Sequence, residues 1–207
     1  MIPTNNDFLM LLTLITAYFL GSFPSGYLAG KYISGIDLRE MGSGSTGATN
    51  VLRYIGKGPA FAVFILDVFK GAASVLLAKY VNQGEFLEVA AGLTSLAGHI
   101  WPIWLNWKGG KAVATGLGVL LGISWQVGIS SFGIFLLTIS CSKIVSLSSI
   151  ISAVSLPVLM LLSFQGNSFK IAYFALSLLA MILVLWRHRS NFKRILAGQE
   201  PKIGQGK

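Results

Sequence analysis

The residues most suited to chemistry lie at positions 41–53, which read MGSGSTGATNVLR. Glycines allow successive backbone N–H groups to turn toward one anion, and the hydroxyl and amide side chains between them add hydrogen-bond donors. Arg53 adds a planar guanidinium that matches phosphate oxygens. A flexible linker is the alternative, but a linker needs neither an asparagine nor an arginine directly before an apolar run. We therefore predict a phosphate-binding loop, formed by Gly42, Gly44, Gly47, Thr49 and Asn50.

A second stretch, residues 98–115, places the sequence KGGK at positions 108–111 directly before a short apolar run. If that run is a helix, its N-terminus presents N–H groups and the positive end of the helix dipole, which favours phosphate. Anchoring at a membrane surface would explain the two lysines but does not require two glycines between them. We therefore expect Lys108, Gly109, Gly110 and Lys111 to hold a substrate phosphate.

Two further polar segments are ambiguous from residue types alone. Residues 187–200, RHRSNFKRILAGQE, follow the last apolar run, where a basic cluster usually binds anionic lipid. Residues 143–149, KIVSLSS, form a short polar connection. Within an apolar run, Asp67 and Lys70 lie three residues apart, and we interpret them as an ion pair rather than as catalytic groups. Two histidines and the single Cys141 give no metal-binding spacing and no disulfide.

The elements that must position these loops are membrane helices. Only 11% of the 207 residues are charged and 54% are hydrophobic, whereas soluble domains carry about 25% charged residues. The net charge of +9 could suggest a nucleic-acid partner. Because the basic residues lie in short gaps between apolar runs, anionic lipid headgroups or anionic substrates fit better, and we expect no nucleic acid.

A helix needs roughly 20 apolar residues to cross the bilayer. The sequence predicts an all-α, polytopic membrane helix bundle in a single domain, 1–207, with about seven transmembrane helices. The first is read as a retained span, not as a signal peptide, and the fourth is short and glycine-rich. Gly118 and Gly122 have the spacing that lets membrane helices pack closely, as do Gly26 and Gly30. The predicted spans are 8–30, 59–81, 86–105, 113–124, 126–140, 145–164 and 169–186.

The distribution of basic residues predicts the orientation of these spans. All but three of the 16 lysines and arginines lie in the segments of one side; Lys79 and Lys170 lie on the other, and Lys70 lies within a span. The rich side is expected to be cytoplasmic. This places the N-terminus outside, the C-terminus in the cytoplasm, and the polar loops on the cytoplasmic face of the inner membrane.

Several spaced motifs in one order resemble those of the PlsY family, the bacterial acyl-phosphate:glycerol-3-phosphate acyltransferases. They are GSFPSG at 21–26, GSGSTGATNVLR at 42–53, LDVFKG at 66–71, the GH, P and KGGK residues of 98–115, and RHRSN with RILAGQE at 187–200. The resemblance runs through nearly the whole chain. Two residues depart from the family pattern: Ser45 stands where Asn is usual, and Ala112 stands where Gly is usual.

The resemblance implies transfer of an acyl chain from acyl phosphate to the sn-1 hydroxyl of glycerol 3-phosphate, giving lysophosphatidic acid and phosphate. It implies catalytic roles for Ser43, Arg53, Lys108 and Asn191, and substrate contacts for Ser146 and His188. The donor is a mixed anhydride with a good leaving group, so no covalent nucleophile, cofactor or metal is required. The hydroxyl proton would pass to a donor-phosphate oxygen, with help from Asn191.

Three other functions compete with this one. A small anion transporter would also contain glycine breaks and basic residues, but it predicts inverted repeats and charges at mid-bilayer. A structural membrane subunit would not explain several polar loops on one side. An acyltransferase that uses acyl-CoA or acyl carrier protein is disfavoured because neither histidine is followed five residues later by an aspartate.

Overall fold

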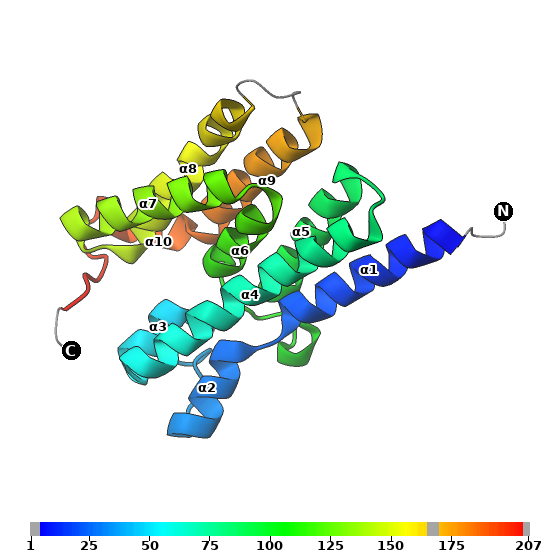
Figure 1. Ribbon diagram of the computed structural model, residues 1–207. Coiled ribbons are helices and arrows are strands. Elements are labelled where there is room, and N and C mark those ends of the chain that lie inside the picture. Colours follow the sequence, from blue (N-terminus) through cyan, green and yellow to red (C-terminus); the bar gives the residue numbers. More distant parts are fainter. Residues whose placement is uncertain (1–4, 165–169, 205–207) are drawn as a thin grey trace. The chain divides into compact units, whose positions relative to one another are not determined.

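The computed structural model of the protein describes residues 5–164 and 170–204, and within them the chain is all-helical, with no strand. This confirms the all-α prediction. The elements, shown in Figure 1, are α1 (Asn5–Ser22), α2 (Ser25–Ser34), α3 (Ala48–Tyr54), α4 (Lys57–Val81), α5 (Glu85–Ile100), the 3-10 helix η1 (Ile103–Leu105), α6 (Val113–Ile123), α7 (Trp125–Ser142), α8 (Val145–Ser163), α9 (Ile171–Arg187) and α10 (Arg189–Leu196).

The chain divides into two compact units, Met1–Ile123 and Ser124–Lys207. In the first unit α4 is the central helix, because it packs against α1, α5 and α6, and α1 packs against α5 in turn. Figure 1 shows α4 lying alongside α1. In the second unit α8 packs against both α7 and α9. The predicted phosphate loops both belong to the first unit, between α2 and α3 and between α5 and α6.

Glycines allow α4 and α6 to approach closely. A Cβ atom added at Gly118 would lie 2.8 Å from the main-chain carbon of Val68, and one at Gly122 would lie 2.8 Å from Cβ of Val75. Both distances are too short for real side chains, so only glycine fits. The packing role predicted for Gly118 and Gly122 is therefore confirmed. Gly26 and Gly30 face a different partner, the segment from Ile36 to Val51.

In the part of the chain that the structure describes, four helical segments are long and apolar enough to cross a membrane, by length and composition. They are Asn6–Ser34, Lys57–Val81, Trp125–Ser142 and Val145–Ser163. A fifth results if α9 and α10, which are bent by 60°, count as one span. The predicted 86–105 span is shorter in the structure, because α5 ends at Ile100, just before Pro102. The predicted start of the last span, Phe169, lies outside the described residues.

The first predicted span, 8–30, is not one continuous helix. It breaks between α1 and α2 at Phe23 and Pro24, because proline has no backbone N–H to continue the hydrogen-bond ladder. The outer faces of the long helices are apolar: Phe61 and Phe69 on α4 and Leu137 on α7 are each at least 65% exposed. Such faces are stable against lipid rather than against water.

Candidate active site

The first loop turns back on itself at two glycines. Gly42 and Gly44 have φ angles of +55° and +66°, a left-handed conformation in which a side chain would be strained. Gly47 then begins α3 as its N-cap residue. The glycine spacing of this stretch is therefore set by the turn itself.

Asn50 holds the first loop in place from inside. Its side chain is 2% exposed, and its Nδ2 atom donates hydrogen bonds to the carbonyl oxygens of Leu38, at 3.1 Å, and Met41, at 3.0 Å. Its Oδ1 atom also accepts from the backbone N–H of Ser43 at 3.5 Å. The sequence suggested a direct phosphate contact for Asn50, but its buried position supports a scaffolding role instead.

The polar groups that the first loop presents to the outside are Ser43 and Arg53, both exposed, and the half-buried Thr49. Among the described residues the side chain of Arg53 makes no hydrogen bond and no ion pair. Ser45 is buried, and its Oγ atom accepts the N–H of Gly47 at 3.4 Å. Ser45, one of the two residues that differ from the family pattern, is therefore still a small polar residue that supports the turn.

The second loop is held by main-chain hydrogen bonds. The N–H of Gly109 donates to the carbonyl of Ile100 at 3.0 Å, and the N–H of Gly110 donates to the carbonyl of His99 at 3.1 Å. Both N–H groups were predicted to face a phosphate, but both already bond to the end of α5. The glycines serve close packing: a Cβ at Gly109 would lie 2.6 Å from Pro102 Cδ, and one at Gly110 would lie 3.0 Å from His99 Cδ2.

The two lysines of the second loop differ in their exposure. Lys108 is exposed, and its side chain makes no hydrogen bond or ion pair among the described residues, whereas Lys111 is half-buried. The helix predicted after Lys111 is present as α6, which begins at Val113. Ala112 precedes it with a φ of +58°. This left-handed conformation costs a non-glycine residue roughly 1–2 kcal/mol, so glycine would adopt it with less strain.

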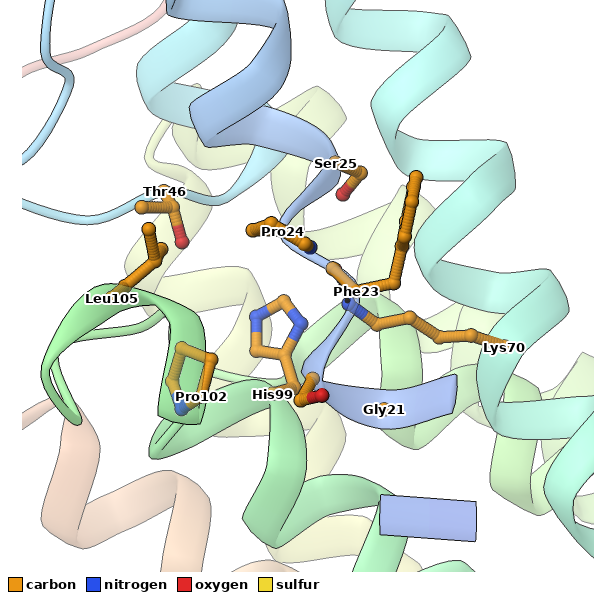
Figure 2. Close-up of a pocket in the computed structure, with 10 residues that line it drawn as sticks. Gly21, Phe23, Pro24, Ser25, Thr46, Lys70, His99, Pro102 and Leu105 are labelled. Carbon is orange, nitrogen blue, oxygen red and sulfur yellow. Dashed lines mark hydrogen bonds between the residues drawn. The ribbon is translucent and has the colours of Figure 1, made fainter. Parts of the chain in front are cut away.

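Arg39 ties the two loop regions together. Its Nε donates to Asp37 Oδ1 at 3.0 Å, and its Nη1 donates to the carbonyl of Leu105, in η1, at 3.2 Å. The hydrogen bond from the Arg39 guanidinium holds the pKa of the Asp37 carboxyl below its usual value. Figure 2 shows a small pocket in the same unit, lined by Thr46 of the first loop and by Leu105 and His99. The two loops are therefore neighbours.

In the second unit a single buried carboxylate organises the predicted site residues. Glu200 Oε1 accepts from Ser146 Oγ at 2.7 Å and from Asn191 Nδ2 at 2.6 Å, and Oε2 accepts from Arg194 Nε at 2.7 Å. Burial alone would raise the pKa of Glu200, but these three hydrogen bonds outweigh it and lower that pKa. This role of Glu200 was not predicted from the sequence. A usable signal was present, because Glu200 is the one acidic residue after Glu88.

His188 lies at the bend between α9 and α10. It is 3% exposed, and its Nδ1 atom lies 2.8 Å from the carbonyl oxygen of Val184. The predicted site residues thus form one set in each unit. Ser43, Arg53, Lys108 and Lys111 belong to the first unit, and Ser146, His188 and Asn191 belong to the second. Among the described residues no group of three or more His, Cys, Asp or Glu side chains could hold a metal ion.

Comparisons with known proteins agree with these features. The family model described as glycerol-3-phosphate acyltransferase matches residues 11–198. The glycerol-3-phosphate acyltransferase of Prochlorococcus marinus strain SARG is 65% identical over 94% of this chain and 95% of its own length. That of strain MIT 9313 is 64% identical over 97% of this chain and 98% of its own length.

Two crystal structures of PlsY (YgiH), an integral membrane glycerol 3-phosphate acyltransferase, are also similar. The glycerol 3-phosphate form has a TM-score of 0.86 at 36% identity and covers 94% of this chain and 96% of its own. The lysophosphatidic acid form has a TM-score of 0.83 at 35% identity, over 94% and 95% of the two chains. The present chain is therefore an integral membrane acyltransferase. It belongs to the glycerol-3-phosphate acyltransferase family, also called PlsY.

Proposed function

We propose that this protein transfers a fatty acyl group from acyl phosphate to the sn-1 hydroxyl of glycerol 3-phosphate, which gives lysophosphatidic acid and phosphate. The family supports the acceptor and the product, because related crystal structures are of glycerol 3-phosphate and lysophosphatidic acid forms. The observation that carries the proposal is the pair of exposed cations on neighbouring loops. The side chains of Arg53 and Lys108 have no partner among the described residues and are available to phosphate groups.

Both proposed substrates carry phosphate, so two anions must be held close together. Arg53, as a fork of N–H donors, and Lys108, as a point charge, offset their repulsion. Ser43 and Thr49 add hydroxyl donors, and Lys111 adds a second ammonium group at the start of α6. The loop glycines (Gly42, Gly44, Gly47, Gly109 and Gly110) shape this surface, and Asn50 fixes it.

The chemistry follows from the donor. The sn-1 oxygen bonds to the acyl carbonyl carbon, the bond from that carbon to the phosphate oxygen breaks, and the hydroxyl proton passes to the departing phosphate. Positioning the hydroxyl and stabilising charge on the phosphate are then the main tasks of the protein. Asn191 assists this transfer, and its amide is held by Glu200 at 2.6 Å. Ser146 and His188 contribute substrate contacts.

We further propose that the whole chain, 1–207, acts as one domain in the inner membrane, with the loops on the cytoplasmic face. The family match across residues 11–198 includes both compact units and supports this. The shorter helices α5 and α6 would complete about seven spans, with the N-terminus outside and the C-terminus inside. The excess of lysine and arginine on one side supports this orientation.

The experiment that tests this function uses purified protein in detergent micelles, incubated with glycerol 3-phosphate and palmitoyl phosphate. Release of phosphate and formation of lysophosphatidic acid should be stoichiometric. A parallel reaction offers palmitoyl-CoA. Arg53→Ala and Lys108→Ala should each lower kcat/KM about 100-fold or more, because each removes a charge that stabilises phosphate. Both residues are exposed, so the thermal unfolding temperature should not change.

Other outcomes of this experiment would favour a different donor, a different site or a different function. Activity with palmitoyl-CoA alone would replace acyl phosphate with a thioester as the donor. Full activity in both variants would remove the two cations from the site. If folded wild-type protein turned over neither donor, uptake of radiolabelled glycerol 3-phosphate into proteoliposomes would test the transporter alternative.

A further inference from the structure

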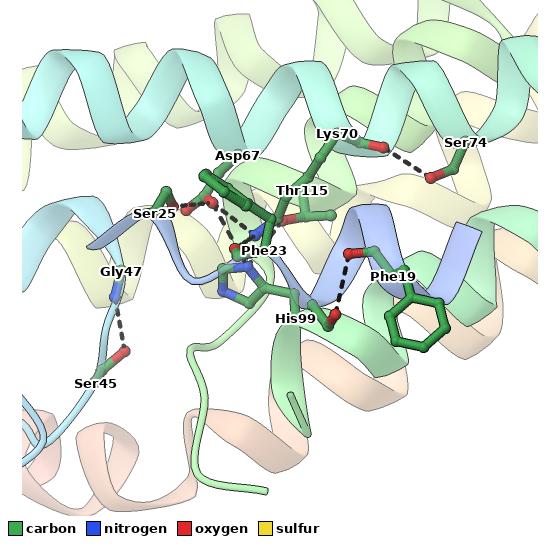
Figure 3. A network of polar contacts seen from close by, with 11 residues as sticks. Phe19, Phe23, Ser25, Ser45, Gly47, Asp67, Lys70, Ser74, His99 and Thr115 are labelled. Atoms are coloured by element: carbon green, nitrogen blue, oxygen red, sulfur yellow. Dashed lines mark hydrogen bonds and ion pairs between the residues drawn. The ribbon is translucent and has the colours of Figure 1, made fainter. Parts of the chain in front are cut away.

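A buried polar network lies in the first unit beneath the second loop, and the proposed chemistry does not use it. Its centre is Asp67 on α4, which is 1% exposed. Figure 3 shows Ser25, Lys70 and His99 converging on it from three different segments. Ser25 Oγ donates to Asp67 Oδ1 at 2.7 Å, and Lys70 Nζ lies 2.8 Å from the same oxygen. Charged groups at this depth in a membrane protein need a reason.

Lys70 connects the network to the break between α1 and α2. Its Nζ atom donates to the carbonyl of Phe23 at 3.1 Å, next to Pro24, where the helical ladder is interrupted. A bare carbonyl in an apolar environment is costly, and the ammonium group satisfies it. Asp67 in turn balances the charge of Lys70. The two side chains together therefore hold the broken segment against α4.

His99 connects the network to the second loop. Its Nδ1 atom lies 3.7 Å from Asp67 Oδ1 and 3.1 Å from Thr115 Oγ1, in the first turn of α6. Its own carbonyl accepts the N–H of Gly110, and its ring occupies the space where a Gly110 side chain would lie. His99 thus contacts Gly110, directly before Lys111, through its carbonyl and its ring. Its ring also contacts Thr115, four residues after Lys111.

We propose that Asp67, Lys70 and His99 are positioning residues, which set the place of Lys108 and Lys111 relative to the substrate phosphate. This inference rests on the proposed function, because it concerns the same phosphate loop. In this proposal they act indirectly, through the carbonyl of Phe23, through Thr115 and through Gly110. Small displacements of a positioning loop can lower catalysis about 100-fold, so the effect is measurable.

The first test compares two conservative variants of His99. The amide of asparagine reproduces the position of Nδ1, whereas the amide of glutamine reproduces that of Nε2 and fills more of the ring volume. Because Nδ1 faces Asp67 and Thr115, His99→Asn should retain most activity. His99→Gln should raise KM for glycerol 3-phosphate about tenfold, with a smaller change in kcat. A side chain that only filled space would give the opposite order, and equal KM values in the two variants would also overturn the proposal.

The second test removes the ion pair without leaving a lone buried charge. The double variant Asp67→Asn/Lys70→Met keeps the side-chain volumes and deletes both charges, and such replacements are often neutral for stability. It should raise KM for glycerol 3-phosphate about tenfold, because the carbonyl of Phe23 loses its donor. Ser74→Ala is the matched control. Ser74 is buried on the same helix, and among the described residues its Oγ bonds only to the carbonyl of Lys70 within α4, at 2.8 Å.

Ser74→Ala should lower the unfolding temperature slightly and leave KM unchanged. An unchanged KM in the double variant would contradict the proposal, and if that variant does not fold, the comparison at His99 decides. The wild-type reaction measured alongside separates the two hypotheses. An inactive wild type would reject the proposed function, whereas an active wild type with unaffected variants would reject only the positioning role.

Discussion

The two predicted phosphate loops present similar groups but are built in different ways. The first loop is held by one side chain, Asn50, whose amide bonds to two carbonyls of the loop. The second loop is held by main-chain bonds from Gly109 and Gly110 to the end of α5. Each displays one exposed cation, Arg53 or Lys108. The first loop should therefore lose its conformation when the Asn50 side chain is removed. The second loop should lose its conformation when a side chain is added at one of its glycines.

The largest effect is expected where the second loop is packed most closely. Gly110→Ala places a methyl group against the ring of His99, so the loop must move and kcat/KM should fall about 100-fold. Gly116→Ala is the matched control, because its nearest neighbour would be Leu96 Cδ2 at 3.8 Å, an ordinary contact. Steady-state assays of both variants measure the difference. Equal activity in the two variants would show that the contact with His99 does not matter.

The first loop should respond to loss of a side chain. Asn50→Ala leaves the buried carbonyl of Leu38 without its donor, at a cost of about 1–3 kcal/mol, and also removes the donor of the partly buried carbonyl of Met41. Thermal unfolding in detergent should show a clear decrease in stability. Asn50→Asp keeps the acceptor oxygen but not the donors, so it should be destabilised similarly. An unfolding temperature equal to that of the wild type in both variants would contradict the scaffolding role.

In the second unit a side chain again holds its neighbours in place, because Glu200 accepts hydrogen bonds from Ser146, Asn191 and Arg194. Because its pKa is lowered in the folded protein, its contribution to stability is complete above the unfolded-state pKa. The contribution is lost as the pH falls through the folded pKa. Unfolding temperatures measured over an acidic pH series should therefore fall more steeply for the wild type than for Glu200→Gln. Parallel curves would mean that the carboxylate does not stabilise the native state.

The smallest effect is expected at Ala112. Its φ of +58° strains any residue but glycine, so Ala112→Gly should relieve that strain. The greater freedom of glycine in the unfolded chain offsets part of the gain, which leaves a net stabilisation of about 0.5 kcal/mol. Differential scanning calorimetry on the two proteins checks the sign. A destabilised glycine variant would show that the left-handed conformation is not strained.

The sequence predicted those features that depend on residues close to one another in the chain. The helix after Lys111, the close packing at Gly118 and Gly122 and the pairing of Asp67 with Lys70 are all present. Each follows from a local pattern: an apolar run behind a loop, a glycine repeat, or a spacing of three on one helical face. The family was also indicated correctly by the order of its motifs.

Contacts between distant segments could not be predicted in this way. Glu200 bonds to Ser146 across 54 positions, and Arg39 bonds to the carbonyl of Leu105 across 66. No periodicity or motif spacing indicates which carbonyl a particular arginine reaches. The role of Asn50 could not be fixed from the sequence for a related reason, because a donor side chain in a glycine loop can face the ligand or the loop itself. The burial of Asn50 in the structure favours the second role.

The bond from Lys70 to the carbonyl of Phe23 also constrains how the protein is made. The break between α1 and α2 leaves the ribosome well before Lys70, which lies 47 positions later in the chain. Until α4 enters the bilayer, the first span contains a polar gap that lipid cannot satisfy. The first hairpin of the protein is therefore expected to mature late at the insertion machinery, held near water or the translocation channel until α4 arrives.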